Sequence, residues 1–248
     1  MVDNELPPIN FRWELIWENR GILAKGLTVA ISVSIIALVF SLVLGLLLAL
    51  TRMSRFKLIS GVSSVYVNIF RGIPALVSVI WVYFGWALLL GHNFTVFQSG
   101  VIALTLLYSA FFSEIFRSAL QAIPLGQREA GLALGISRLK IFKSIIMPQA
   151  TKIALPNIGS MYIGMVKDTS TFAIIGLAEV VRVVQDLNSI NFQPFVLFTA
   201  AALLYVFVAF IVDQIFRSIE KNFSYPPTGK VAQFLTKGKK TRIDKLMG

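Results

Sequence analysis

Apolar residues along the chain gather into runs long enough to cross a membrane, and short polar or basic segments separate these runs. A helix crosses a hydrocarbon core of about 30 Å with about 20 apolar residues, because each residue adds about 1.5 Å. Runs of this kind cover approximately residues 26–50, 73–90, 100–117, 153–178 and 195–217. The pattern therefore predicts an all-α integral membrane protein with five transmembrane helices.

The second run is the least regular of the five. Arg71, Gly72 and Pro74 interrupt a longer apolar stretch that begins near Leu58. A charged side chain is costly inside hydrocarbon, and proline breaks the helical hydrogen-bond pattern. We therefore expect Arg71 to lie at the membrane boundary.

Composition agrees with a bilayer environment and excludes several classes of function. Of the 248 residues, 56% are hydrophobic and 14% are charged, which leaves too little polar surface for a soluble globule. The absence of cysteine and the single histidine, His92, exclude disulfides, thiolate nucleophiles and the usual metal motifs. The net charge of +11 would suit nucleic acid, but the basic residues lie between apolar runs without interleaved aromatics. We expect no nucleic acid partner, no metal and no catalytic site.

Basic residues in the loops orient the chain, because cytoplasmic loops are enriched in lysine and arginine. The segment 91–100 contains none, and the segment 179–194 contains only Arg182. The basic residues gather instead between the first two runs, between the third and fourth runs, and after the fifth; they include Arg52, Arg55, Lys57, Arg128, Arg138, Lys140, Lys143, Lys152 and Lys221. Five spans then place the amino terminus outside and the carboxyl terminus in the cytoplasm.

Three regions follow from this orientation. We expect an N-terminal extracytoplasmic segment over residues 1–25 and a five-span transmembrane domain over residues 26–220. A basic cytoplasmic tail over residues 221–248 is expected to touch anionic membrane lipid.

The long basic loop over about residues 124–149 is predicted to form two short helices. Pro124 and Gly126 indicate the start of the first, with Glu129 at its third position, where the helix dipole favours a carboxylate. Gly135 is expected to end that helix. Ser137 is expected to cap the second helix, and Pro148 to end it before the fourth span.

Small side chains on the first of these helices would let another surface approach closely. Ala130, Gly131 and Ala133 leave little bulk there, and Glu129 would offer that surface a negative charge. The segment therefore suits a groove on a partner. The alternative is an ordinary solvated, amphipathic loop, and these features alone leave both interpretations open.

The sequence "EAGLALGISRLKIFKSIIMP" resembles the loop signature of the membrane subunits of ABC importers. That signature is Glu-Ala-Ala, three residues, Gly, nine residues, Ile, one residue and Leu-Pro. The positions that match in register are Glu129, Ala130, Gly135, Ile145 and Pro148. Gly131 replaces the second alanine and Met147 replaces the leucine, and both changes conserve size or apolar character.

The resemblance extends to four blocks and narrows the family. "NIFRGIPALVSVIWVYFG" (68–85), "YSAFFSEIFRSALQAIPLGQREAGLALG" (108–135), "MPQATKIALPNIG" (147–159) and "KDTSTFAIIGLAE" (167–179) are similar to blocks of the polar amino-acid permeases, which carry histidine, glutamate, glutamine, arginine and opines. The resemblance implies a five-span permease subunit that pairs with a second permease chain. It also implies a loop docked on a cytoplasmic ABC ATPase dimer and an extracytoplasmic solute-binding protein that delivers the amino acid.

No phosphate-binding loop of the type Gly-x-x-x-x-Gly-Lys-Ser/Thr occurs in the chain, so we expect no cofactor here and place ATP and magnesium on the ATPase. An opine or a cystine-like compound remains an alternative substrate. A secondary transporter is the further alternative, although we find no internal repeat of interrupted spans.

The fourth apolar run contains an unusual pair of charges, Lys167 and Asp168, near the expected middle of the membrane. On a continuous helix Lys167 would share a face with Ser170 and Thr171, and these four residues are our candidate substrate path. Structural bonds to neighbouring helices are the alternative role for the two charges. Elsewhere, Glu114 and Arg117 are interpreted as a boundary pair, and Ser160 with Gly164 as a close-packing motif.

Overall fold

The computed structural model describes residues 10–223, so residues 1–9 and the predicted tail from 224 onward lie outside the described part of the chain. Within residues 10–223 the regular structure is helical and contains no strand. The α-helices are α1 (Glu14–Glu18), α2 (Arg20–Arg52), α3 (Lys57–Gly72), α4 (Ala75–Ile80), α5 (Trp86–Leu90), α6 (Val96–Gln121), α7 (Leu125–Ala133), α8 (Arg138–Ile141), α9 (Met147–Asp168), α10 (Val180–Asn191) and α11 (Pro194–Phe223). Two π-helical segments, η1 (Trp81–Gly85) and η2 (Phe142–Ile146), and one 3-10 helix, η3 (Thr169–Ile175), join them.

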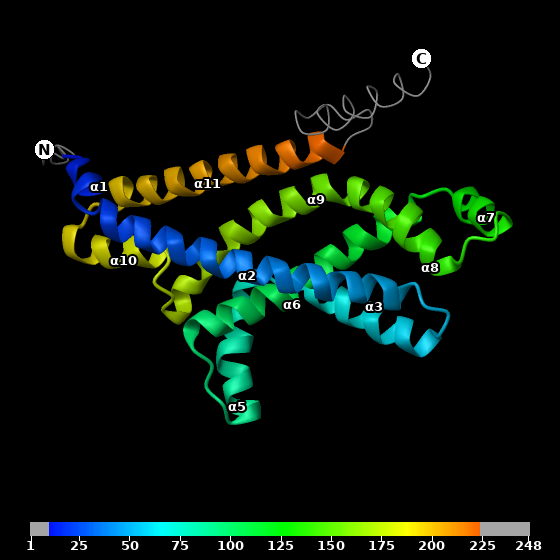
Figure 1. The fold of residues 1–248 in the computed structure, drawn as a ribbon. Coiled ribbons are helices and arrows are strands. Elements are labelled where there is room, and N and C mark those ends of the chain that lie inside the picture. The colour runs from blue at the N-terminus through cyan, green and yellow to red at the C-terminus, as the bar shows by residue number, and fades with distance from the viewer. Residues whose placement is uncertain (1–9, 224–248) are drawn as a thin grey trace, which may run out of the picture.

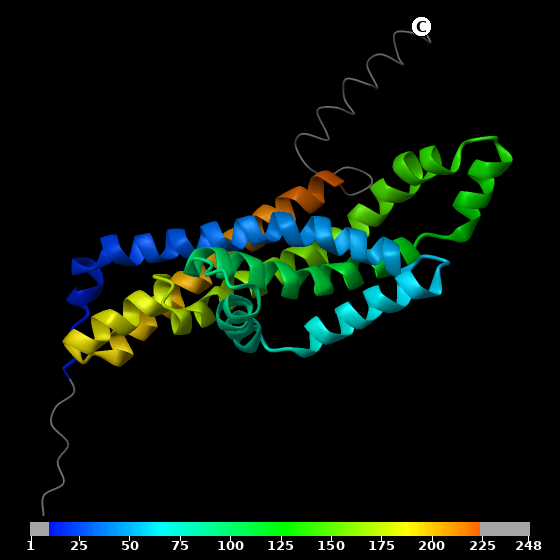
Figure 2. The ribbon, with the colours of Figure 1, turned by 90° about the horizontal axis from the view of Figure 1, so that it is seen from below.

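The long helices lie lengthwise in an elongated bundle (Figures 1 and 2). Helices α2 and α11 begin at the same end of the bundle, and the ring of Phe195 at the start of α11 lies 5.0 Å from the ring of Phe11. Helix α9 runs in the opposite direction, away from the end that carries α7 and α8 (Figure 1). Helix α11 runs from the end that it shares with the start of α2 toward the end that carries α7 and α8 (Figure 1).

Glycines set the closest contacts between these helices. A Cβ atom added at Gly45 of α2 would lie 2.8 Å from Cβ of Phe112 on α6, and one added at Gly159 of α9 would lie 2.7 Å from Cγ of Phe216 on α11. Small residues let membrane helices approach this closely. The predicted packing pair is only partly correct, because Ser160 is exposed while Gly164 lies against the Tyr108 hydroxyl of α6. Gly159, beside Ser160, makes the tight contact instead.

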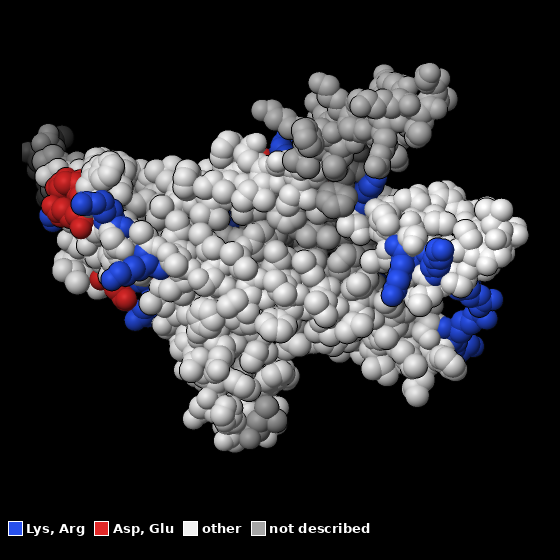
Figure 3. Space-filling view, viewed as in Figure 1, with Lys and Arg blue, Asp and Glu red and all other residues white. Residues whose placement is uncertain are grey.

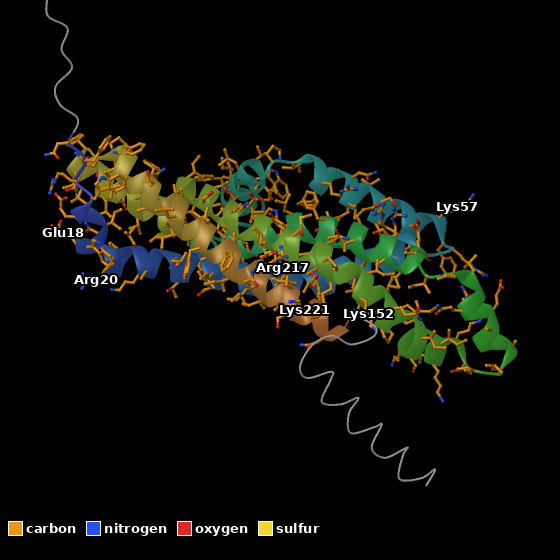
Figure 4. The ribbon with its side chains drawn as sticks, turned by 90° about the horizontal axis from the view of Figure 1, so that it is seen from above. Glu18, Arg20, Lys57, Lys152, Arg217 and Lys221 are labelled. Carbon is orange, nitrogen blue, oxygen red and sulfur yellow. The ribbon has the colours of Figure 1, made fainter. Side chains whose placement is uncertain are left out.

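Three helices in the described part of the chain are long and apolar enough to cross a membrane: α2, α6 and α11. They contain the predicted runs 26–50, 100–117 and 195–217, each within one longer helix. Charged side chains gather toward the two ends of the bundle and leave a broad uncharged surface between them (Figure 3). Glu18 and Arg20 lie at one end and Lys57 at the other, joined by the length of α2 (Figure 4). This distribution is that of a membrane-spanning bundle.

The second predicted run becomes part of a bent pair. Helix α3 and the helical segment from Ala75 to Leu89 meet at an angle of 111°, and together they could make a fourth span. Ile73, at the break, has an extended backbone with φ −93° and ψ 131°, as expected for a residue that precedes proline. The apolar stretch before Pro74 thus forms its own helix, with Arg71 in its last turn.

The predicted span 153–178 does not form one regular helix. Helix α9 begins earlier, at Met147, and ends at Asp168, where the 3-10 helix η3 takes over. Helix α9 is long enough to cross a membrane, but its polar residues lower its mean hydropathy below that of α2, α6 and α11. These polar residues include Thr151, Lys152, Asn157 and Ser160. In residues 10–223, three helices are long and apolar enough to cross a membrane, or four spans if the bent pair counts as one. The predicted number of five spans is therefore not confirmed.

Candidate functional site

The loop between α6 and α9 projects from one end of the bundle and carries two short helices (Figure 2). Helix α7 follows Pro124 and ends at Ala133, and Gly135 adopts a left-handed backbone with φ +72°. The amide of Ile136 donates to the carbonyl of Gly131 at 3.0 Å, and the amide of Gly135 donates to the carbonyl of Leu132 at 3.0 Å. These bonds satisfy the last carbonyls of the helix. The predicted helix end at Gly135 is confirmed.

Glu129 does not occupy the predicted position. Because α7 begins at Leu125, Glu129 is its fifth residue, and the first turn contains no acidic side chain. No side chain caps the start of this helix. The exposed carboxylate of Glu129 therefore lies on the outer surface of α7, beyond the first turn where the dipole is strongest.

Gly131 faces the interior of the loop. A Cβ atom there would lie 2.8 Å from Cδ1 of Ile141, so the glycine lets α7 pack directly on α8. The expectation that Gly131 leaves room for a partner is wrong, because Ile141 already fills that space. Ala130 and Ala133 remain exposed and small.

Pro148 does not end the second helix. Helix α8 continues through η2 into α9, and Pro148 is the second residue of α9. The wider π-helical turns lie directly before the proline, which lacks an amide donor and would clash in a regular helix interior. Ile145 belongs to η2 and is half-buried. Ser137 precedes α8, but its side chain makes no capping hydrogen bond.

Two glutamine side chains join α7 of the loop to the start of α9. The Nε2 group of Gln127 donates to Oε1 of Gln149 at 3.0 Å, and the Nε2 group of Gln149 donates back to Oε1 of Gln127 at 2.6 Å. Gln149 also donates to the carbonyl of Ile145 at 2.7 Å. This contact fixes α7 against α9. The sequence offers no local signal for it, because the two glutamines are 22 residues apart.

The outer surface of the loop combines apolar and basic side chains. Leu125, Leu134 and Leu139 are exposed there. The exposed basic residues are Arg128, Arg138, Lys140 and Lys143. Beside the loop, a groove of about 510 Å³ is lined by the ends of α2 and α6 and by residues of the loop that include Pro124, Arg128 and Phe142. The surface suits a protein partner that offers apolar pockets, negative charge opposite the basic residues and a positive group opposite Glu129.

The four candidate path residues lie around the junction of α9 and η3. Asp168 is half-buried, and its Oδ2 accepts a hydrogen bond from the Tyr108 hydroxyl of α6 at 2.8 Å. Lys167 is exposed. Thr171 donates to the carbonyl of Asp168 at 2.8 Å. Lys167 does not share one continuous α-helix with Ser170 and Thr171, because α9 ends at Asp168 and a 3-10 helix follows, a geometry that aligns residues three apart and not residues four apart.

A buried carboxylate that the sequence interpretation missed stands at the start of α10. Glu179 is fully buried and accepts hydrogen bonds from the amides of Val181 and Arg182, each at 2.8 Å, and from the Tyr205 hydroxyl at 2.7 Å. A Cβ atom at Gly26 of α2 would lie 3.1 Å from the Glu179 carbonyl carbon. Glu179 thus joins α2, α10 and α11.

The carboxylate of Glu114 on α6 lies near three arginine side chains, one each from α2, α3 and α6. Nη1 of Arg52, at the end of α2, lies 2.5 Å from Oε2 of Glu114, and Arg117 pairs with the same carboxylate through Nη2 and Nε. Nη1 of Arg71, in the last turn of α3, lies 3.9 Å from Oε2. The predicted pair with Arg117 exists within this larger cluster.

Residues 41–225 match the family described as the binding-protein-dependent transport system inner membrane component. The chain belongs to this family. The match covers more than half of the chain and includes the loop, the Glu114 cluster, Asp168 and Glu179. The chain is accordingly a multi-pass membrane permease of the ABC importer type.

Named relatives of this permease cover most of its length. It is 33% identical over 216 residues to the glutamine transport system permease protein GlnP of Escherichia coli K12, which covers 86% of this chain and 98% of GlnP. It is 33% identical over 226 residues to the L-cystine transport system permease protein TcyB of Bacillus subtilis 168, covering 88% and 95%. It is 34% identical over 200 residues to the arginine ABC transporter permease protein ArtQ of Haemophilus influenzae, covering 78% and 90%.

Solved structures agree with this permease fold. The crystal structure of an amino acid ABC transporter with histidines superposes with a TM-score of 0.80 at 28% identity and covers 86% of this chain and all of that chain. The inward-facing MetNI methionine ABC transporter superposes with a TM-score of 0.71 at 21% identity and covers 84% and 98%, a likeness of fold alone.

Proposed function

We propose that this permease carries a polar amino acid across the inner membrane of the cell, in an ABC importer powered by ATP hydrolysis on a partner subunit. The observation that carries the proposal is the near full-length similarity to permeases named for glutamine, arginine and cystine. Since the cystine permease is as similar as the glutamine permease, a cystine-like compound is the second candidate substrate. The chain itself is a transport subunit without a catalytic site.

The ATPase is proposed to dock on the loop of α7 and α8. The residues proposed to present or shape this contact are Glu129, Ala130, Gly131, Gly135, Ile145 and Pro148. Exposed leucines and basic side chains on the loop support a protein contact, and the packing of Gly131 on Ile141 supports a rigid one. ATP and magnesium would bind to the ATPase dimer, and the loop would carry its motion through α9 to the bundle.

A second permease chain and an extracytoplasmic solute-binding protein complete the proposed importer. We propose five crossings, made by α2, the bent segment α3 to α5, α6, α9 with η3, and α11. The alternating directions of α2, α9 and α11 support this count. The amino terminus would lie outside, and the loop of α7 and α8 would lie in the cytoplasm.

Cysteine labelling tests this orientation. A cysteine placed at Asn93, between α5 and α6, should react with a membrane-impermeant maleimide on intact cells. A cysteine placed at the exposed Ser137 should react only after permeabilisation. The opposite pattern would put the loop on the wrong side of the membrane for the ATPase. The chain has no native cysteine, so each variant carries a single reactive thiol.

The substrate is proposed to pass the junction of α9 and η3, where Lys167, Asp168, Ser170 and Thr171 lie. The hydrogen bond of Asp168 to Tyr108 supports a structural contribution from Asp168. Lys167 is exposed and is the better candidate for a substrate contact.

Lys167→Met separates these two roles. If Lys167 contacts the substrate, uptake should fall by about tenfold or more while the complex still assembles, because a charge-assisted hydrogen bond is lost. Co-purification of the ATPase and size-exclusion chromatography measure assembly. Loss of the complex from the membrane would show that Lys167 supports the fold instead. Lys152→Met, an exposed lysine near the start of α9, is the control and should retain uptake.

Purification of the tagged chain from its native membrane tests the proposed function as a whole. An ABC ATPase and one or two permease chains should co-purify. Isolation without any nucleotide-binding partner, together with uptake that follows an ion gradient, would favour a secondary transporter.

A further inference from the structure

The Glu114 cluster contains more positive charge than its single carboxylate can neutralise. Arg52 and Arg117 occupy the carboxylate at hydrogen-bonding distance, and Arg117 also donates to Oε1 of Gln121 at 2.7 Å. Arg71 approaches no closer than 3.9 Å, which is beyond a hydrogen bond. Three guanidinium groups therefore share one carboxylate, which leaves an excess of two positive charges.

Arg71 is the member of this cluster that is available to a ligand. Its side chain is 42% exposed, against 14% for Arg52 and 28% for Arg117. Among the described residues its one ion-pair partner is Glu114, which the other two arginines already occupy. A guanidinium group offers five donors in a planar arrangement that matches a carboxylate with two parallel hydrogen bonds.

A line of contacts joins Arg71 to the candidate substrate path. The guanidinium carbon of Arg71 lies 6.0 Å from the centre of the Phe111 ring, and that ring lies 5.8 Å from the ring of Tyr108. The Tyr108 hydroxyl donates to Asp168 at 2.8 Å. Helix α4, which follows the bend just after Arg71, also packs against η3. The ring contacts thus connect Arg71 to Asp168, and the helix that follows Arg71 in the chain packs on the segment that follows Asp168.

We propose that Arg71 is a second binding position on the substrate path and that it takes the carboxylate of the transported amino acid. The inference rests on the proposed function. Two aromatic rings separate Arg71 from Asp168, so the Arg71 position is distinct from a contact at Asp168. Phe111 supplies an aromatic face beside the guanidinium, which orients it through a cation–π contact.

Two other roles would explain the same geometry. Arg71 could be a structural strut that depends on Glu114, in which case both residues act as a unit. It could instead hold the phosphate of an anionic lipid, because a phosphate matches a guanidinium as well as a carboxylate does.

The test uses the assembled importer in proteoliposomes, with L-glutamine, L-arginine and L-cystine as probes. The amino acid that the wild type transports is then compared, in equilibrium binding to the assembled importer, with its decarboxylated amine. The wild type should bind the amino acid more tightly than the amine. In Arg71→Gln the ratio of the affinity for the amino acid to the affinity for the amine should fall by about 10-fold to 100-fold. In Arg71→Lys this ratio should fall less. Lys57→Gln, an exposed lysine at the other end of α3, is the control and should keep the preference.

Each contrary result points to a different error. A preference unchanged in Arg71→Gln would overturn the inference while leaving the proposed function intact. Equal losses in Arg71→Gln and Glu114→Gln, with no further loss in the double variant, would assign a strut. A preference that appears only when phosphatidylglycerol replaces phosphatidylcholine would assign the lipid phosphate. Failure of the wild type to transport any of the three amino acids would remove the proposed function and this inference with it.

Discussion

Gly135→Val is expected to uncouple the importer while leaving the spanning helices in the membrane. Gly135 has φ +72°, and nothing lies within 4 Å of an added Cβ atom, so the cost comes from the backbone and not from a clash. A β-branched residue held in this conformation costs about 1–3 kcal/mol, and α7 would change its direction relative to α8. Uptake and substrate stimulation of the ATPase should fall by about fivefold to 100-fold, in line with that cost.

Gly135→Asn is the matched control, because asparagine tolerates the left-handed conformation that valine does not. This variant should retain most of the coupling. Wild-type uptake in Gly135→Val, or equal losses in both variants, would show that the turn geometry has no role in coupling.

Glu129→Lys tests the chemistry of the same surface without strain. The carboxylate is exposed on α7 and lies beyond its first turn, so the change should act through the charge offered to the ATPase and not through the helix dipole. Less ATPase should co-purify with this variant than with Glu129→Gln. Unchanged co-purification would place the contact elsewhere.

Glu179→Ala is expected to have the largest effect on stability. The substitution would leave three donors without their acceptor: the amides of Val181 and Arg182 and the hydroxyl of Tyr205. Each buried donor left unsatisfied costs about 1–3 kcal/mol, so a total of roughly 3 kcal/mol or more is expected. Thermal unfolding of the purified complex should show a marked fall in its midpoint.

Graded variants make this prediction specific. Tyr205→Phe removes one of the three hydrogen bonds and should cost about a third as much, while Glu18→Ala removes an exposed carboxylate and should leave the unfolding midpoint nearly unchanged. An unfolding midpoint in Glu179→Ala equal to that of the wild type would mean that water replaces the carboxylate and that α10 is not fixed by it.

The sequence predicts those features of the fold that depend on neighbouring residues. The apolar runs locate α2, α6 and α11 because spanning length follows directly from hydrophobicity. Gly135 ends α7 because the left-handed position favours glycine whatever surrounds it. The prediction for Pro148 is wrong because proline usually ends a helix, whereas here the π-helical turns before it let the helix continue through it.

Contacts between distant residues are the features that the sequence does not predict. The pairing of Gln127 with Gln149 and the approach of Arg52 to Glu114 depend on how whole helices pack. No glycine or proline marks the end of α9 at Asp168, where η3 begins and packs against α4 and α6. The local sequence therefore predicts where the residues of the candidate site lie along the chain. Which of their side chains make contact depends on the tertiary structure.

ATP-driven uptake into proteoliposomes tests whether this permease works in an ATP-powered amino-acid importer. The co-purified importer, with nucleotide sealed in the lumen on the side of its ATPase and the binding protein added outside, should take up radiolabelled glutamine, arginine or cystine only when the lumen contains ATP and magnesium. Uptake should vanish when a non-hydrolysable nucleotide replaces ATP. Movement that needs no ATP and instead follows an imposed proton or sodium gradient would contradict the account.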